Sequence, residues 1–136
     1  MKIDLFKDRR DLIRRIVAVG LVNYIRNNRG NYGEVTIKKL LKSAYEYAEE
    51  FGVDGVVTEE MRRFLRDVMG DYGIGLPIYL VLVRQYMERL GDLGVEVIDG
   101  RVIRYKVYRE KAPDFWELSK ANPESAVKLV MQKLGD

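Results

Sequence analysis

The fold is decided by residues 83–110, VRQYMERLGDLGVEVIDGRVIRYKVYRE, where helical spacing of apolar residues gives way to strand alternation. Gly91 and Gly94 end the helical pattern. Two strand-like runs follow, at 95–98 and 101–108, and Asp99-Gly100 between them is a strong signal for a tight hairpin turn. This stretch therefore predicts a helix that runs directly into a two-stranded ribbon.

The second strand of this ribbon is basic on one face. Alternation directs Ile103, Tyr105 and Val107 to one side, so we expect Tyr105 in the core. Four cations on or beside the strand are candidate phosphate contacts: Arg101, Arg104, Lys106 and Arg109. Tyr108 shares the face of Arg104 and Lys106 and is a candidate for stacking on a base or for covering the sheet. The alternative interpretation is the solvated face of a half-buried hairpin.

Outward from the ribbon, the sequence predicts mostly helix. The expected helices span 5–28, 37–51, 59–70, 76 or 77 to 90, and 123–134, with a short element around 115–118. The first helix is apolar nearly all round in its second half, so we expect that half to be central to the core. The predicted fold class is mainly α with a small β-hairpin, a winged-helix-like bundle of four helices, hairpin and C-terminal helix. We expect one domain, 1–136, with a basic N-terminal helix (1–30) and a C-terminal extension (112–136).

Charge is unevenly distributed along the chain. Residues 1–30 carry eight Lys or Arg against three Asp, residues 31–60 three against seven acids, and residues 101–111 five against one. The sequence therefore predicts two basic zones and one acidic zone. In the first zone, Arg10, Arg14 and Arg15 are candidate phosphate contacts; the alternative is a solvated face in which Asp11 pairs with Arg14 or Arg15.

The composition argues against several classes of function. The chain lacks Cys and His, which removes thiolate nucleophiles, imidazole bases and zinc sites built on those residues. No Gly-rich loop is followed by Lys-Ser/Thr, so we expect no enzyme, cofactor, metal or small-molecule substrate. No apolar run approaches the roughly 20 residues of a membrane span, so we expect an intracellular, cytoplasmic protein without a membrane partner. Five Asn and two Gln against 45 charged residues favour a thermophilic source.

Residues 58–108 resemble a winged helix-turn-helix. Thr58–Gly70 corresponds to the supporting helix, residues 71–75 (DYGIG) to the turn, Pro77–Leu90 to the recognition helix and Val95–Tyr108 to the wing. The resemblance implies binding of double-stranded DNA, with Arg84 and Arg89 of the recognition helix as further contacts. Because the first turns of that helix are apolar, we expect binding directed largely to phosphates, as in a small regulator or chromatin-associated factor.

The same helix is too apolar for a single buried stripe. We expect part of it to form an oligomer interface, with these candidates: Ile78, Tyr79, Val81, Leu82 and Trp116. For Phe115 and Trp116 the alternatives are packing onto the core or onto a partner. A homo-oligomer, and as a third function class a protein–protein adaptor, are therefore kept as hypotheses.

A second resemblance concerns residues 72–77, YGIGLP, which run into a helix that contains tyrosines. This segment is similar to one in coat proteins of filamentous DNA viruses of hyperthermophiles. In that family basic N-terminal helices wrap the genome and a helical bundle forms the shell. The resemblance implies, as the alternative function, a DNA-wrapping capsid protein located in a virion.

Overall fold

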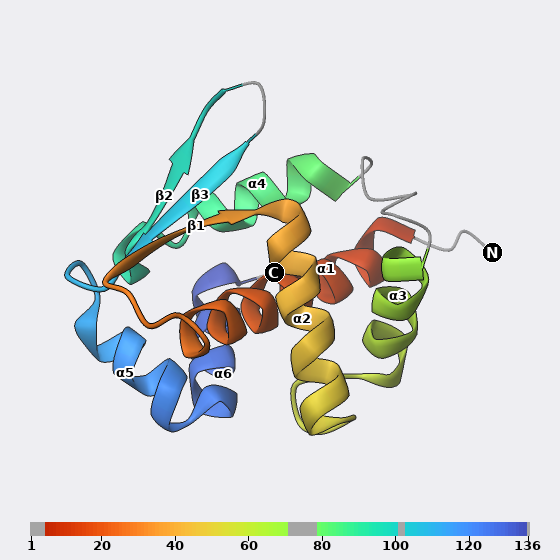
Figure 1. Ribbon diagram of the computed structural model, residues 1–136. Helices are drawn as coiled ribbons and strands as arrows, with labels where there is room; N and C mark the ends of the chain where they lie inside the picture. The colour runs from red at the N-terminus through yellow and green to blue at the C-terminus, as the bar shows by residue number, and fades with distance from the viewer. Residues whose placement is uncertain (1–4, 71–78, 101–102, 136) are drawn as a thin grey trace.

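The computed structural model describes residues 5–70, 79–100 and 103–135, with side chains from residue 9 onward. This part of the chain is mainly helical with a small antiparallel sheet, as predicted (Figure 1). Its elements are, in order, α1 (Leu5–Arg26), β1 (Tyr32–Thr36), α2 (Ile37–Phe51), α3 (Glu59–Gly70), α4 (Leu80–Glu88), the 3-10 turn η2 (Gly91–Leu93), β2 (Val95–Ile98), β3 (Arg104–Tyr108), α5 (Pro113–Ala121) and α6 (Pro123–Leu134).

Helix α1 is the centre of the molecule. It packs against α2, α3, α4, α5 and α6 (Figure 1). Residues 16–23 are all buried, so this part of the helix is enclosed on every side, as its apolar composition predicts. The polar member of this run, Asn23, donates from Nδ2 to the Ser43 carbonyl oxygen at 2.8 Å and thereby ties α1 to α2.

The sheet has three strands instead of the two that the sequence predicts. Strand β1 lies between the predicted helices 5–28 and 37–51, where the sequence predicts no strand, and it pairs antiparallel with β3 to give the order β1-β3-β2. The register places Thr36 opposite Arg104 and Glu34 opposite Lys106. The five residues of β1 alternate weakly in polarity and contain a glycine, so they carry little strand signal of their own.

Most predicted boundaries hold, and three change. The first helix ends at Arg26, the fourth ends at Glu88, and the short element around 115–118 is the full helix α5. Three helices have side-chain N-caps: Thr36, Thr58 and Asn122 each accept a backbone N–H from the residue three positions later. The predicted starts of the fourth helix at 76 or 77 and of the second strand at 101 lie outside the described residues.

Gly20 sets how closely α1 and α2 approach. A Cβ built on Gly20 would lie 2.5 Å from the Leu40 carbonyl oxygen and 2.9 Å from Leu40 Cδ1. An alanine is a better helix former than glycine by about 1 kcal/mol, but here it would collide with the backbone of α2.

We predict that Gly20→Ala destabilises the protein despite the gain in helix propensity. Forcing the two helices apart should cost about 1–3 kcal/mol beyond that gain and lower the Tm by about 5 °C. Thermal unfolding followed by circular dichroism measures this. Gly91→Ala, whose Cβ would meet no described atom within 4 Å, is the control and should leave the Tm unchanged or raise it slightly. A stabilised Gly20→Ala variant would contradict the close approach.

Candidate nucleic-acid interface

The outer face of the sheet carries a row of alternating charges. Lys106 of β3 lies directly opposite Glu34 of β1 on one side and Glu96 of β2 on the other. Tyr105 and Val107 face the core and are fully buried, as the alternation predicts. Cross-strand neighbours of opposite charge attract, but each glutamate also forms an ion pair with another cation, Glu34 with Arg104 and Glu96 with Lys111, so together they offset the charge of Lys106 only in part.

Arg104 and Arg109, the other described cations of the ribbon, each form an ion pair with a carboxylate. Arg104 Nη1 lies 3.2 Å from Glu34 Oε1, and Arg109 Nη2 lies 2.8 Å from Glu117 Oε1. Arg101 lies outside the described residues. The excess of basic residues along the single strand therefore does not become an equal excess on the folded sheet, because β1, β2 and α5 contribute acids beside it.

Helix α4 presents few free cations. Arg84 pairs with both Glu88 at 3.0 Å and Asp99 at 2.8 Å, and these partners raise its pKa above the ordinary arginine value. Arg89 donates from Nη1 to the carbonyl oxygen of Leu134 at 2.6 Å, at the end of α6. The exposed positions of the helix itself are Val81, Gln85 and Glu88. This surface offers little to a phosphate backbone.

The two helices of the proposed helix-turn-helix pack mainly on other elements. Helix α3 lies against α2 and α1, whereas α4 lies against α1 and β2. An edge-on contact between the rings of Phe64 and Tyr79, with centroids 6.1 Å apart, joins α3 to the start of α4. The turn expected at 71–75 lies outside the described residues.

The arginines of α1 are held by Asp11. Arg14 Nη2 lies 2.7 Å from Asp11 Oδ1 and Arg15 Nε lies 2.8 Å from Asp11 Oδ2. Both arginines also donate to backbone carbonyl oxygens, Arg14 to Gly135 and Arg15 to Val56. The solvated-face alternative is thus present in the structure, with Arg14 and Arg15 joining α1 to distant segments, while Arg10 is exposed.

The candidate contacts chosen from the sequence do not include a cluster of lysines on α2. The three cations of residues 31–60 are Lys38, Lys39 and Lys42, and all three are exposed on the first turns of α2. None of them forms an ion pair with a described residue. The seven acids of the same window dominated its charge count, although six of them follow at residue 46 or later. A shorter window would have found the cluster.

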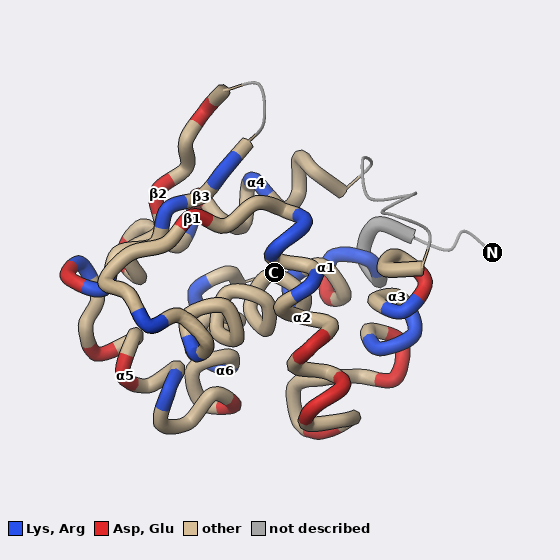
Figure 2. The backbone as a smooth tube through the Cα atoms, viewed as in Figure 1, with Lys and Arg blue, Asp and Glu red and all other residues tan. Residues whose placement is uncertain are grey.

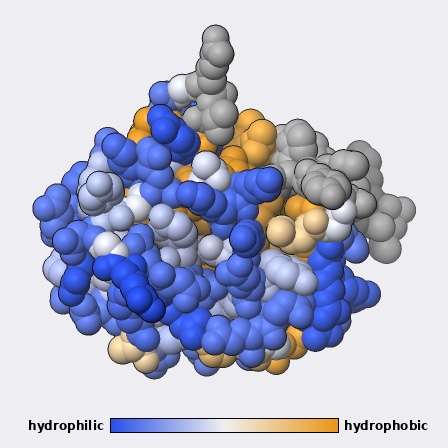
Figure 3. Space-filling view, viewed as in Figure 1, coloured by the Kyte–Doolittle hydropathy of each residue, from blue (hydrophilic) through white to orange (hydrophobic). Residues whose placement is uncertain are grey.

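The candidate interface residues separate into exposed and buried ones. Val81 is 68% exposed, and Tyr79 and Leu82 are half-buried against the core. Trp116 is 1% exposed, so the expectation that it lies at an oligomer interface is corrected: it packs into the core of its own chain. Ile78 lies outside the described residues. In Figure 3 apolar surface gathers over α4 and the adjoining ribbon, smaller apolar patches lie along the lower edge, and most of the rest of this face is hydrophilic.

Tyr108 is half-buried on the outer face of β3, as its position in the strand predicts. The ammonium group of Lys111 lies 4.6 Å from the centroid of its ring. Such a cation contact already occupies one aromatic surface. Tyr108 therefore lies on the face where stacking was expected, but Lys111 of the same chain already contacts its ring.

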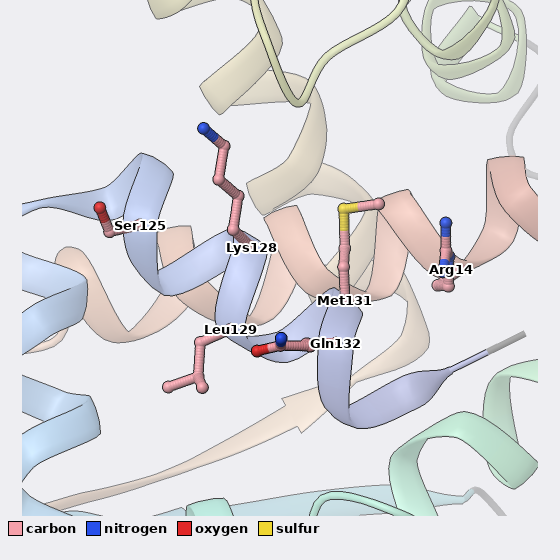
Figure 4. A pocket seen from close by; sticks show the side chains of 6 residues that line it. All are labelled: Arg14, Ser125, Lys128, Leu129, Met131 and Gln132. Atoms are coloured by element: carbon pink, nitrogen blue, oxygen red, sulfur yellow. The ribbon is translucent and has the colours of Figure 1, made fainter.

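A hollow of about 450 Å³ lies over α6, and its polar side chains do not point toward a common centre where a ligand could bind. Figure 4 shows its side chains pointing in different directions; they are Arg14, Ser125, Lys128, Leu129, Met131 and Gln132. Within the described ranges, no group of acidic side chains is arranged to hold a metal ion. Nor does any helix in those ranges have the length and apolar character for crossing a bilayer.

Comparisons with known proteins identify no relative. No protein-family model, curated protein or solved structure matches the chain. On the described surface, the α2 lysines are the strongest concentration of cations without carboxylate partners.

Asp11 links pH to stability. Burial raises the pKa of Asp11, but hydrogen bonds from Arg15 and Arg14 outweigh burial and hold its pKa below the ordinary value. A carboxyl group whose folded-state pKa is lowered stabilises the fold above its unfolded pKa, near 3.9, and that stabilisation is lost as pH falls through the folded value.

We predict that Asp11→Asn destabilises the protein at pH 7 by no more than about 1 kcal/mol, because the pair is half exposed. The difference from the parent protein should be much smaller at about pH 2, below the unfolded pKa of Asp11, because the contribution of the charged carboxylate is lost as pH falls through the folded value. Urea unfolding at the two pH values measures it. An equal difference at both would show that packing, and not charge, accounts for the effect.

Proposed function

We propose that this protein binds double-stranded DNA through the phosphate backbone, with Lys38, Lys39 and Lys42 of α2 as the principal contacts. The observation that carries the proposal is the exposure of these three lysines on two successive turns, without carboxylate partners among the described residues. Lysine clusters of this kind supply the sequence-independent part of nucleic-acid affinity.

The position of these lysines is unfavourable for folding. Lys38 and Lys39 lie in the first turn of α2, which contains no acidic residue. The positive end of the helix dipole disfavours cations there by about 0.3–1 kcal/mol. Lys38 and Lys42 are also like charges at i and i+4, which repel each other by about 0.2–0.5 kcal/mol. Attraction of an anionic partner would account for a placement that lowers stability.

The cluster continues onto β3. Thr36, the N-cap of α2, lies opposite Arg104, so the first turn of α2 begins beside the N-terminal end of β3, the central strand that carries Arg104 and Lys106. Figure 2 shows basic segments on β3 and at the start of α2 and acidic segments at the far end of α2, whereas α3 carries both signs of charge. This polarity would orient the molecule on a polyanion.

The chemistry of the surface favours backbone contacts over base readout. Lysine is a point charge suited to phosphate, whereas bidentate recognition of a base edge uses arginine, asparagine or glutamine. The exposed positions of α4 offer Gln85 alone among these types. We therefore infer that affinity depends on salt far more than on sequence, as expected for a chromatin-associated factor.

We predict that replacing Lys38, Lys39 and Lys42 with Gln weakens binding to unrelated duplexes equally. The slope of log K against log salt should fall by about 0.9 for each phosphate that the variant no longer neutralises. Fluorescence anisotropy of a labelled duplex across a salt series measures the slope. The same variant should have a higher Tm, because the like-charge repulsion and the unfavourable dipole interaction are removed.

Two matched variants control this experiment. Replacing Arg63, Lys128 and Lys133 with Gln removes the same formal charge elsewhere and should change the slope much less. Arg104→Gln with Lys106→Gln tests the ribbon, whose cations already face Glu34 and Glu96; a smaller effect than that of the α2 variant is expected. The proposal fails if the α2 variant keeps the slope of the parent protein.

A further inference from the structure

Tyr32, at the start of β1, is the most exposed aromatic side chain in the described part of the chain, at 67%. It lies opposite Tyr108 across the β1–β3 ladder. The Arg109 N–H donates to the Asn31 carbonyl oxygen at 2.8 Å, which makes the next pair along, Tyr32 and Tyr108, a non-hydrogen-bonded pair. Side chains of such pairs lie closer together than those of hydrogen-bonded pairs.

Tyr32 also lines two open hollows on the surface. On one side is a hollow of about 490 Å³, lined by Tyr24, Asn27, Asn28, Arg29, Ser43 and Glu46 together with Tyr32. On the other is one of about 430 Å³, lined by Asn31, Tyr108, Arg109, Glu110 and Pro113 together with Tyr32. Both volumes fall within the range of sites for small organic groups, and the phenol ring offers surface to each.

The polar groups beside Tyr32 are unusual for this chain. It contains only five asparagines, and three of them, Asn27, Asn28 and Asn31, lie within the five residues before Tyr32. Asn27 and Asn31 are exposed, and Arg29 lies exposed between them. Side-chain amides both donate and accept hydrogen bonds, so this loop can match the mixed donor and acceptor edge of a planar ligand.

The loop that carries these groups is held in place. Asn28 Oδ1 accepts from the Gly30 N–H at 2.8 Å, and Lys120 of α5 donates from Nζ to the Asn28 carbonyl oxygen at 2.6 Å. Gly33 lets the chain pass close to α1, because a Cβ there would collide with the Tyr24 hydroxyl. The loop and α5 lie side by side in Figure 1. The loop before Tyr32 is thus fixed by hydrogen bonds within itself and to α5.

We propose that Tyr32 is the stacking platform for an unpaired nucleobase, with the neighbouring amides facing the base edge and the exposed Arg29 facing the adjoining phosphate. This inference rests on the proposed function and extends it from duplex to single-stranded ends or loops. Stacking on a tyrosine is sequence-tolerant because every base has a flat π-face. The carboxylates of Glu46 and Glu110 can each accept from an exocyclic amino group.

The two parts of the surface are within reach of one strand. Tyr32 and Thr36 are the ends of β1, and four residues of extended strand span about 14 Å. The α2 lysines begin two residues beyond Thr36. A single strand whose base stacks at Tyr32 can therefore place its following phosphates near Lys38 and Lys39, past the Arg104 side of the sheet.

The test compares Tyr32→Ala with Tyr32→Phe on labelled oligodeoxythymidylate, oligoadenylate RNA and a blunt DNA duplex. We expect Tyr32→Ala to bind both single strands about tenfold more weakly, the size expected when one base stack is removed, and to bind the duplex as the parent protein does. Tyr32→Phe keeps the ring and should stay within about twofold. Phe51→Ala, which removes an exposed aromatic elsewhere, is the matched control and should change neither.

Three results would overturn the proposal: single-strand binding that survives Tyr32→Ala, an equal loss on duplex and single strand, or a neutral oligosaccharide that competes at the same site. Thermal unfolding of each variant confirms that the chain is folded. The α2 lysine variant separates this inference from the proposed function. If that variant leaves duplex binding intact while Tyr32→Ala lowers single-strand binding, the duplex proposal fails and the stacking site remains.

Discussion

Enclosure of α1 by the other five helices is the constraint on which the structure depends. A helix that is buried on every side has no solvent-exposed polar face, so each neighbouring element must pack an apolar face against it. Gly20 allows α2 to approach closely, and Asn23 satisfies its amide on the α2 backbone. At its N-terminal half, where α1 emerges from this enclosure, Arg14 and Arg15 reach Gly135 and Val56. The arginines of that half thus join segments far apart in the chain.

Strand β1 has an importance out of proportion to its length. It completes the sheet, brings Glu34 beside the basic strand β3, sets Thr36 to cap α2, and presents Tyr32 at its far end. The same five residues therefore reduce the charge of the ribbon and position both the α2 lysines and the aromatic platform. The candidate surface moves away from the hairpin tip and toward the junction of β1 with α2.

The arginines of the two basic zones are mostly bonded to carboxylates or carbonyl oxygens, whereas the lysines of the proposed surface form no such bond with a described residue. An arginine that bridges a carboxylate and a backbone carbonyl, as Arg14 and Arg15 do, must break those bonds before it can bind a phosphate. The α2 lysines make no comparable bonds with the described residues. Counting cations along a sequence therefore overestimates those that are available, because each window ignores acids that folding brings from elsewhere.

The sequence by itself determined the helices, their caps and the central place of α1, since these depend on periodicity and on residues within one turn of each other. It also determined which side of β3 faces the core, because strand alternation is local. Only the tertiary structure decided the pairing of β1, the burial of Trp116, and the carboxylates that face Arg104, Lys106 and Arg109. These depend on contacts between residues as far as 70 or more positions apart, as for Glu34 and Arg104, and no local pattern records such contacts.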